Sequence, residues 1–376
     1  MLGYFTLVGL FLLLFSLCFY PAVRELLRPL DDTPLPVDIE YIRRENYFGE
    51  SFRAKMQEWT REWMRDRMDT DLPLAGAVDG NQSVRAIIEK PDGERIVVFG
   101  GGSWKGDRET ADVIYCQSDL CLPKDAVFRS EIYAVGNVQA GERTELRSVA
   151  ADGNIVLEAG TKVSRWVDSR RNVVVRKGTV VGSRVSSAET IELEPGVSAE
   201  SLYAPRIFTI GFGNRHEALN DSRDDSRIRR SPAGRKKQGA DFNGHACTRL
   251  GPETRLVQGD LELGSGTAVE ENLVVKGTLR TGAQCSFRGS VKANGLALGA
   301  LNNIEGNVVS TKAIEIGRST HVAGSVIAEQ DILLRSGVRV GRVGCFAVVS
   351  AGKNVTLEAN VAVSGKIAAG RAVITV

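Results

Sequence analysis

The chain has only three histidines, His216, His245 and His321, and histidine is the side chain most often used as a general base. His216 and His245 lie in a polar, basic stretch, whereas His321 lies in a repeated segment. No triad of serine, histidine and aspartate, and no paired carboxylates, can be assigned from the spacing. We therefore predict no catalytic residues and no enzyme activity.

The six cysteines have neither zinc-ligand spacing nor the pattern of a disulfide framework, and they are Cys18, Cys116, Cys121, Cys247, Cys285 and Cys345. Cys116 and Cys121 are close enough in sequence to form a disulfide in an oxidising compartment, and would stay thiols in a reducing one. We expect Cys285 and Cys345 to be small apolar core residues. No metal or cofactor is predicted.

A glycine-rich stretch from Gly100 to Gly106, GGGSWKG, has some likeness to a phosphate-binding loop. Its glycine and lysine spacing is wrong for a Walker sequence, and no helical pattern follows it. We interpret it as a flexible join. The formal net charge is +2, so composition predicts no nucleic-acid partner either.

The strongest pattern in the sequence is an internal repeat. AIEIGRSTHV begins at Ala313, and DILLRSGVRV begins 18 residues later at Asp331. Related phrases begin at Asp119, Asn137, Asn154, Asn172, Thr190, Asp260, Gly295 and Asn354. Apolar alternation inside a fixed period predicts a mainly β fold, a single-stranded parallel β-helix in which short strands stack from coil to coil. Asn, Asp and Gly are expected at its left-handed corners.

A second phrase, apolar-x-Gly-x-apolar, recurs in the later coils at Gly259, Gly277, Gly289, Gly306, Gly324 and Gly365. The interval from Gly277 to Gly289 is only 12 residues. It predicts either one short coil or a slip of the repeat register.

These valine- and isoleucine-rich coils, as in VAGSVIAEQDILLRSGVRV, resemble the bactofilins, polymer-forming bacterial cytoskeletal proteins with a right-handed β-helix core. The resemblance covers Cys116 to about Arg206 and Cys247 to Val376. It implies a right-handed β-helix and a structural role that positions cell-envelope or cell-shape machinery. The chain departs from the family pattern in its two coil blocks, its long N-terminal region and its lack of a proline-rich tail.

The N-terminal run from Leu2 to Val23 contains no charged residue, and its length predicts a transmembrane helix. We expect residues 1–23 to be a retained, single-pass anchor in the bacterial inner membrane. A cleaved signal peptide is the alternative, but no Lys or Arg precedes the run and no small-residue cleavage site follows it. Arg24 and Arg28 favour a cytoplasmic soluble part, with a periplasmic one as the alternative.

Residues 24–75 are expected to form a juxtamembrane linker and an amphipathic helix. The apolar stripe of this helix consists of Phe52, Met56, Trp59 and Trp63. The helix could form a coiled coil, lie on a membrane surface, or pack on the first coil and cap the solenoid. Residues 76–115 are expected to form a β-hairpin around Pro91-Asp92-Gly93 and a join to the coils.

The coils are expected in two blocks, residues 116–209 and 247–376, separated by a basic, flexible insertion at 210–246. The insertion offers a candidate contact for an anionic partner through Arg227, Arg229, Arg230, Arg235, Lys236 and Lys237. A merely solvated loop is the alternative.

The last coil has no charged cap, so it would present unpaired backbone groups and an apolar cross-section. We expect this end to pair with another copy, giving a homo-oligomer or filament, or a dimer if the N-terminal hairpin and helix block the other end. The predicted self-assembly interface is Val361, Val363, Ala372, Val373, Ile374 and Val376.

The sequence thus predicts a membrane-anchored, bactofilin-like scaffold whose partners are itself, the membrane and envelope-biosynthesis proteins. Because 18 is three times six, a left-handed β-helix acyltransferase built on hexapeptide repeats is an alternative, with one of the histidines as its base. A periplasmic β-helix adaptor that binds envelope polymers is another, although the outward positions carry no aromatic ladder for stacking on sugars.

Overall fold

The computed structural model describes residues 45–68, 84–90, 93–211, 238–239, 247–250, 253–342 and 344–376. The chain divides into one unit at Met1–Tyr47 and another at Phe48–Val376, and the second contains almost all of the described residues. The predicted anchor at 1–23 and the predicted basic contact residues at 227–237 lie outside them. Among the described helices, none is long and apolar enough to cross a membrane.

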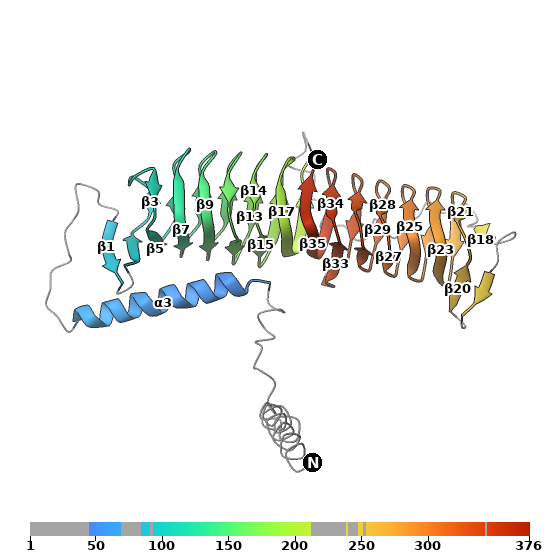
Figure 1. Ribbon diagram of the computed structural model, residues 1–376, viewed down its shortest axis with the longest axis horizontal. Coiled ribbons are helices and arrows are strands. Elements are labelled where there is room, and N and C mark those ends of the chain that lie inside the picture. Colours follow the sequence, from blue (N-terminus) through green and yellow to red (C-terminus); the bar gives the residue numbers. More distant parts are fainter. Residues whose placement is uncertain are drawn as a thin grey trace, which may run out of the picture. The chain divides into compact units, whose positions relative to one another are not determined.

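The second unit is a parallel β-solenoid of about 13 turns, with about 18 residues per turn (Figure 1). Strands pair in register with their equivalents in the turns before and after. Ile155, for example, lies between Val138 and Val173. The predicted parallel β-helix is therefore confirmed as the architecture.

The first block begins with a hairpin and ends with a long strand. Its strands are β1 (Val84–Glu89), β2 (Arg95–Phe99), β3 (Gly102–Ser103), β4 (Glu109–Thr110), β5 (Val113–Cys116), β6 (Leu120–Cys121), β7 (Val127–Ala134), β8 (Val138–Ala140), β9 (Glu145–Ala151), β10 (Ile155–Leu157), β11 (Lys162–Val163), β12 (Val167–Ser169), β13 (Val173–Val175), β14 (Val180–Val181), β15 (Arg184–Ser187), β16 (Thr190–Leu193) and β17 (Ser198–Thr209). The predicted hairpin is confirmed, because β1 pairs antiparallel with β2.

The second block also begins with an antiparallel pair, β19 with β20. Its strands are β18 (Gln238–Gly239), β19 (Cys247–Arg249), β20 (Thr254–Val257), β21 (Leu261–Leu263), β22 (Thr267–Val269), β23 (Asn272–Thr281), β24 (Ser286–Phe287), β25 (Val291–Leu298), β26 (Asn303–Ile304), β27 (Val308–Ser310), β28 (Ile314–Ile316), β29 (His321–Val322), β30 (Val326–Ala328), β31 (Ile332–Leu334), β32 (Arg339–Val340), β33 (Ala347–Ala351), β34 (Asn354–Leu357) and β35 (Ala362–Thr375).

The corners of the coils use two different devices. Asn and Asp stack as a side-chain ladder, in which Asn154 Nδ2 donates to Asn137 Oδ1 at 3.1 Å and Asn172 Nδ2 donates to Asn154 Oδ1 at 3.0 Å. The left-handed backbone lies at another corner, which Gly160 and Gly178 take in consecutive turns and Leu301, at φ 59°, takes in the second block. Asp125 and Asn360 are also left-handed there, so the expectation of Asn, Asp and Gly at left-handed corners is confirmed at those positions. It is wrong for the repeat asparagines, whose side chains supply the order instead.

The short interval from Gly277 to Gly289 is a slip of register and not a short coil. A Cβ on Gly277 would lie 2.3 Å from Asp260 Oδ1, whereas one on Gly289 would lie 2.6 Å from the backbone nitrogen of Asn272. The two glycines thus occupy different corners. The turns between them keep their length, since Leu273 pairs with Val291 and Leu279 with Leu296.

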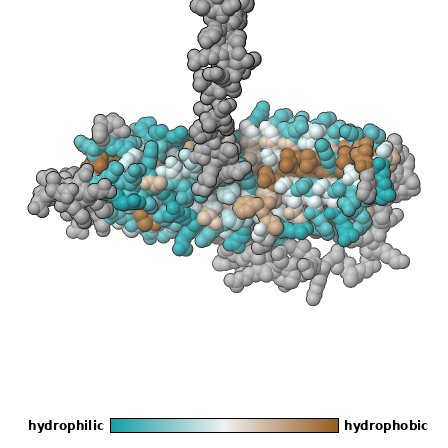
Figure 2. All heavy atoms as spheres, turned by 90° about the horizontal axis from the view of Figure 1, so that it is seen from below, coloured by the Kyte–Doolittle hydropathy of each residue, from teal (hydrophilic) through white to brown (hydrophobic). Residues whose placement is uncertain are grey.

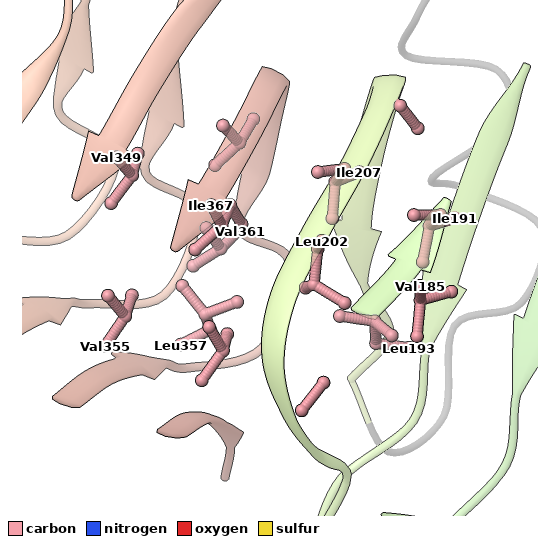
Figure 3. Close-up of a cluster of buried hydrophobic side chains, with 14 of the residues drawn as sticks. Val185, Ile191, Leu193, Leu202, Ile207, Val349, Val355, Leu357, Val361 and Ile367 are labelled. Atoms are coloured by element: carbon pink, nitrogen blue, oxygen red, sulfur yellow. The ribbon is translucent and has the colours of Figure 1, made fainter. Parts of the chain in front are cut away.

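The two blocks meet at their C-terminal ends, because each winds toward the middle of the solenoid (Figure 1). β17 pairs antiparallel with β35, with Leu202 opposite Ile367 and Ala199 opposite Val373. The antiparallel register relates the blocks by an approximate two-fold axis. Apolar side chains from both blocks fill one shared interior across this joint (Figure 3).

Two buried threonines close the joint in equivalent ways. Thr209 Oγ1 donates to the Glu358 carbonyl at 2.6 Å and accepts from Val361 N at 2.9 Å. Thr375 Oγ1 donates to the Glu194 carbonyl at 2.7 Å and accepts from Val197 N at 2.9 Å. Each block therefore satisfies polar backbone groups that the other block leaves at its end.

The residues of the predicted self-assembly interface all lie in or next to β35. The prediction assumed that the last coil is uncovered, and the joint shows that this assumption is wrong. Val361, Val363 and Val373 are buried within the chain, and Val373 and Ile374 are paired with β17. Contact with another copy is not tested by one chain. The bare C-terminal edge on which the prediction rested is, however, already filled by the first block.

Replacing Thr209 and Thr375 together by valine should lower the free energy of unfolding by about 2–6 kcal/mol, because buried carbonyl and N–H groups lose their partners. Denaturant unfolding of the full chain measures this. Thr248→Val, at an exposed position in β19 far from the joint, should change it by less than about 0.5 kcal/mol. An unchanged midpoint in the double variant would show that the joint does not need these bonds.

Candidate functional site

One continuous face runs through both blocks and across their joint. Its strands, in spatial order, are β1, β2, β5, β7, β9, β12, β15, β17, β35, β33, β30, β27, β25, β23, β20 and β19. We call this the long sheet. One surface of it lines the core and the other faces outward, so successive residues alternate between the two.

Helix α3 (Tyr47–Met68) lies across the outer surface of the long sheet in the first block (Figure 1). Met56 is fully buried in a cluster with Ile96, Val113, Ala150 and Trp166. Phe48, Phe52 and Trp59 pack against the same cluster. The ring of Phe52 meets that of Trp166 edge-on, with 5.9 Å between centroids. Side chains four or three residues apart on the helix thus meet the outward row of the sheet.

Two arginines link the helix to the sheet by ion pairs. Arg170, which follows β12, has Nη2 3.5 Å from Oε2 of Glu50 in the helix, and Arg53 of the helix is buried against the sheet. The Arg53 side chain is only 1% exposed, and it forms an ion pair with Asp168 and another with Asp152, with Nε 3.0 Å from Oδ1 of Asp152. It also donates to the carbonyls of Ala151, at 2.8 Å, and Asp168, at 3.1 Å. The buried guanidinium thus donates hydrogen bonds to two carbonyls through Nη2 and is charge-paired with two carboxylates through Nε and Nη1.

The partners of Arg53 are themselves held in place. Ser186 donates to Asp168, and the Tyr133 hydroxyl donates to Asp152 Oδ2 at 2.9 Å. Burial raises the pKa of the Tyr133 hydroxyl to about 12, and the hydrogen bond to Asp152 is the next largest cause of this rise. Burial also raises the pKa of Asp168, against the opposing effects of Arg53 and Ser186. The cluster is therefore a rigid polar lock within an apolar contact.

The first turn of the helix comes unusually close to the sheet. A Cβ added to Gly49 would lie 2.3 Å from Cγ of Asp168. Only glycine permits this approach, which brings Arg53 one turn later within reach of both carboxylates. Gly49 is thus a positioning residue for the lock.

The structure decides between the three readings of the predicted helix. Phe52, Met56 and Trp59 pack on the solenoid, while the side chain of Trp63 lies outside the described residues. The helix does not cap an end, because it lies along a side and crosses the strands. Sequence reasoning missed Arg53, Asp152 and Asp168, whose only signal was a charge adjoining the apolar stripe.

The other candidate residues are not brought together. His216 and His245 lie outside the described residues, and His321 lies in β29, with Asn303 and Arg339 beside it in register. Cys116 and Cys121 are free thiols, the first buried and the second exposed. Cys285 is buried as expected, but Cys345 is exposed, because the coil after β32 bulges outward through an Arg342–Cys345 bridge. No metal-binding group of His, Cys, Asp and Glu occurs among the described residues.

Comparison with known proteins adds no assignment. No protein-family model, curated protein or solved structure matches the chain. The strand register by itself defines the chain as a β-solenoid protein. The resemblance to bactofilins remains an interpretation of the sequence repeat.

Replacing Arg53 by methionine should weaken docking of α3 by about 3–5 kcal/mol at neutral pH, because Asp168 is left buried without its cation. A carboxyl whose pKa is raised on folding binds its proton more tightly in the docked state, so docking weakens as pH rises above the ordinary aspartate range. Loss of Arg53 raises the pKa of Asp168 further, because the cation that favours the charged carboxylate is gone. Acidification protonates Asp168 and should therefore restore part of the docking.

Hydrogen exchange of the α3 amides, followed as a function of pH, measures this effect. Arg61→Met is the matched control, because Arg61 is exposed on the same helix. Equal protection of α3 in Arg53→Met and in the unchanged chain would contradict the role of the lock. A loss that is the same at all pH values would contradict the role of Asp168.

Proposed function

We propose that this chain is a membrane-tethered, bactofilin-like structural scaffold that positions envelope or cell-shape proteins at a bacterial inner membrane. The observation that carries the proposal is the pairing of β17 with β35. It joins two short blocks into one solenoid with a single long sheet, and a helix is already bound along part of that sheet. A rigid surface that binds helices is suited to holding partners at fixed spacing.

The tether and its surroundings belong to the proposal. Residues 1–23 are the anchor, and the soluble part is cytoplasmic. The basic residues Arg227, Arg229, Arg230, Arg235, Lys236 and Lys237 form the contact for an anionic partner. Their support is the apolar run, the two arginines that follow it and the basic composition.

In this proposal the solenoid is complete within one chain and is not a polymer subunit. The C-terminal coil, which was expected to join copies, is used inside the chain. The outer strands of the long sheet are β1 and β19, each paired antiparallel to its neighbour. β19 is short and ends in exposed Arg249. Short, charged edge strands discourage pairing with other chains.

Electron microscopy and sedimentation of the full chain in detergent test this proposal. About 13 turns at about 4.8 Å each predict single rods of roughly 60 Å at all concentrations. Val373→Arg, which buries a charge at the joint, should give two shorter lobes, whereas exposed Val180→Arg should leave the rods unchanged. Filaments that lengthen with concentration would contradict a complete rod.

Vesicle flotation tests the tether separately. The full chain should float with vesicles at high salt, and a chain lacking residues 1–23 should not, because the apolar run supplies the anchoring energy. Flotation of both chains would contradict the assignment of the anchor.

A further inference from the structure

The second block carries a largely apolar, partly exposed row on the outer surface of the long sheet. Figure 2 shows apolar surface on the underside over this block. The row, in order of strand pairing, is Leu256, Val274, Lys292, Val309 and Ile327. Ile327 is 43% exposed, and Val348 in the adjoining row is 36% exposed. Lys292, also exposed, is the single charge among these aliphatic side chains.

This row is the two-fold equivalent of the row that α3 covers. Counted outward from the joint, one row is Tyr203, Ser186, Asp168, Ala150 and Tyr133, and the other is Ala368, Ser350, Ile327, Val309 and Lys292. Ala150 and Tyr133 are fully buried in the contact with the helix. Val309 and Lys292 occupy their positions in the second block.

We propose that this row binds an amphipathic α-helix of a partner protein whose apolar stripe includes a carboxylate. The helix would complete, over the second block, the layer that α3 forms over the first. This partner class belongs to the scaffold function proposed above. The inference rests on that function, because only a scaffold requires a partner on this surface.

The carboxylate follows from the position of Lys292. A helix placed as α3 is placed would cover Lys292, just as α3 covers Tyr133. Burying an ammonium without a counter-charge is unfavourable, so the helix must supply an acidic side chain there. In the first block the charges are reversed, since the helix brings Arg53 and the sheet brings Asp152 and Asp168.

This charge pattern disfavours α3 of a second copy as the occupant. Arg53 would meet Ile327 in place of Asp168, and no carboxylate stands where Asp168 does. A flat bilayer surface is disfavoured by geometry. α3 adds a layer about 10 Å thick to the same surface, which holds a flat bilayer away from the neighbouring row.

The length of the face sets the length of the helix. The strands β20, β23, β25, β27, β30 and β33 follow one another across it. At about 4.8 Å per strand they span roughly 24 Å, which corresponds to about 16 helical residues.

Photo-crosslinking from a photoreactive residue placed in β27 or β30 of the full chain in nanodiscs tests the proposal with two synthetic helices. Both peptides have about 16 residues and a leucine stripe, and they differ only in a central glutamate or lysine on that stripe. The glutamate peptide should crosslink to β27 and β30, and Ile327→Asp should lower the yield about tenfold or more. Lys292→Glu should reverse the preference to the lysine peptide, which a loss of folding would not do.

Val180→Asp is the matched control, because Val180 is exposed elsewhere in the first block and should leave the yield unchanged. Equal yields with both peptides, or a yield insensitive to Ile327→Asp, would overturn the proposal. Adducts mainly between chains would assign the row to a second copy, and adducts mainly with lipid would assign it to the bilayer. Rod length in micrographs, measured on the same variants, separates failure of this site from failure of the scaffold.

Discussion

The structure depends on how the last coil of each block is closed. A β-solenoid ends in a row of backbone donors and acceptors above an apolar interior, and both need a partner. Here each block is the partner of the other, through β17 and β35 and through Thr209 and Thr375. Because β17 and β35 pair antiparallel, the two blocks wind toward each other. The equivalent sheets of the two blocks therefore lie on the same side of the solenoid and join into the long sheet.

The long sheet then divides the chain's surface into two related halves. In the first block aromatic side chains and two carboxylates receive α3, with Arg53 as the cation between them. In the second block Ile327, Val309 and Lys292 stand in place of Asp168, Ala150 and Tyr133. Similar geometry with reversed charge is what allows one protein to hold its own helix on one half and to select a different helix on the other.

Much of the fold could be predicted from the sequence, because the coil period and its apolar alternation are local properties repeated many times. The hairpin at β1 and β2 could be predicted from a different local signal, the turn residues Pro91-Asp92-Gly93. The direction of the second block could not be predicted from the sequence. An open edge of the last coil indicates that another strand must pair with it, but not whether that strand comes from the same chain or from another one. The left-handed corner at Leu301 and the outward bulge at Cys345 carry no distinguishing residue type. The lock around Arg53 joins residues about a hundred positions apart, so neither local spacing nor periodicity indicates it.

The most direct test of the account is a disulfide across the joint. Ser201 and Ala368 face each other in the β17–β35 register, and both would be replaced by cysteine in a chain whose exposed Cys121, Cys247 and Cys345 are changed to serine. Oxidation should give a crosslink within one chain, located by mass spectrometry, and Ser201→Cys alone should give none. A crosslink mainly between two chains, or no crosslink at all, would contradict the closure of the two blocks on each other.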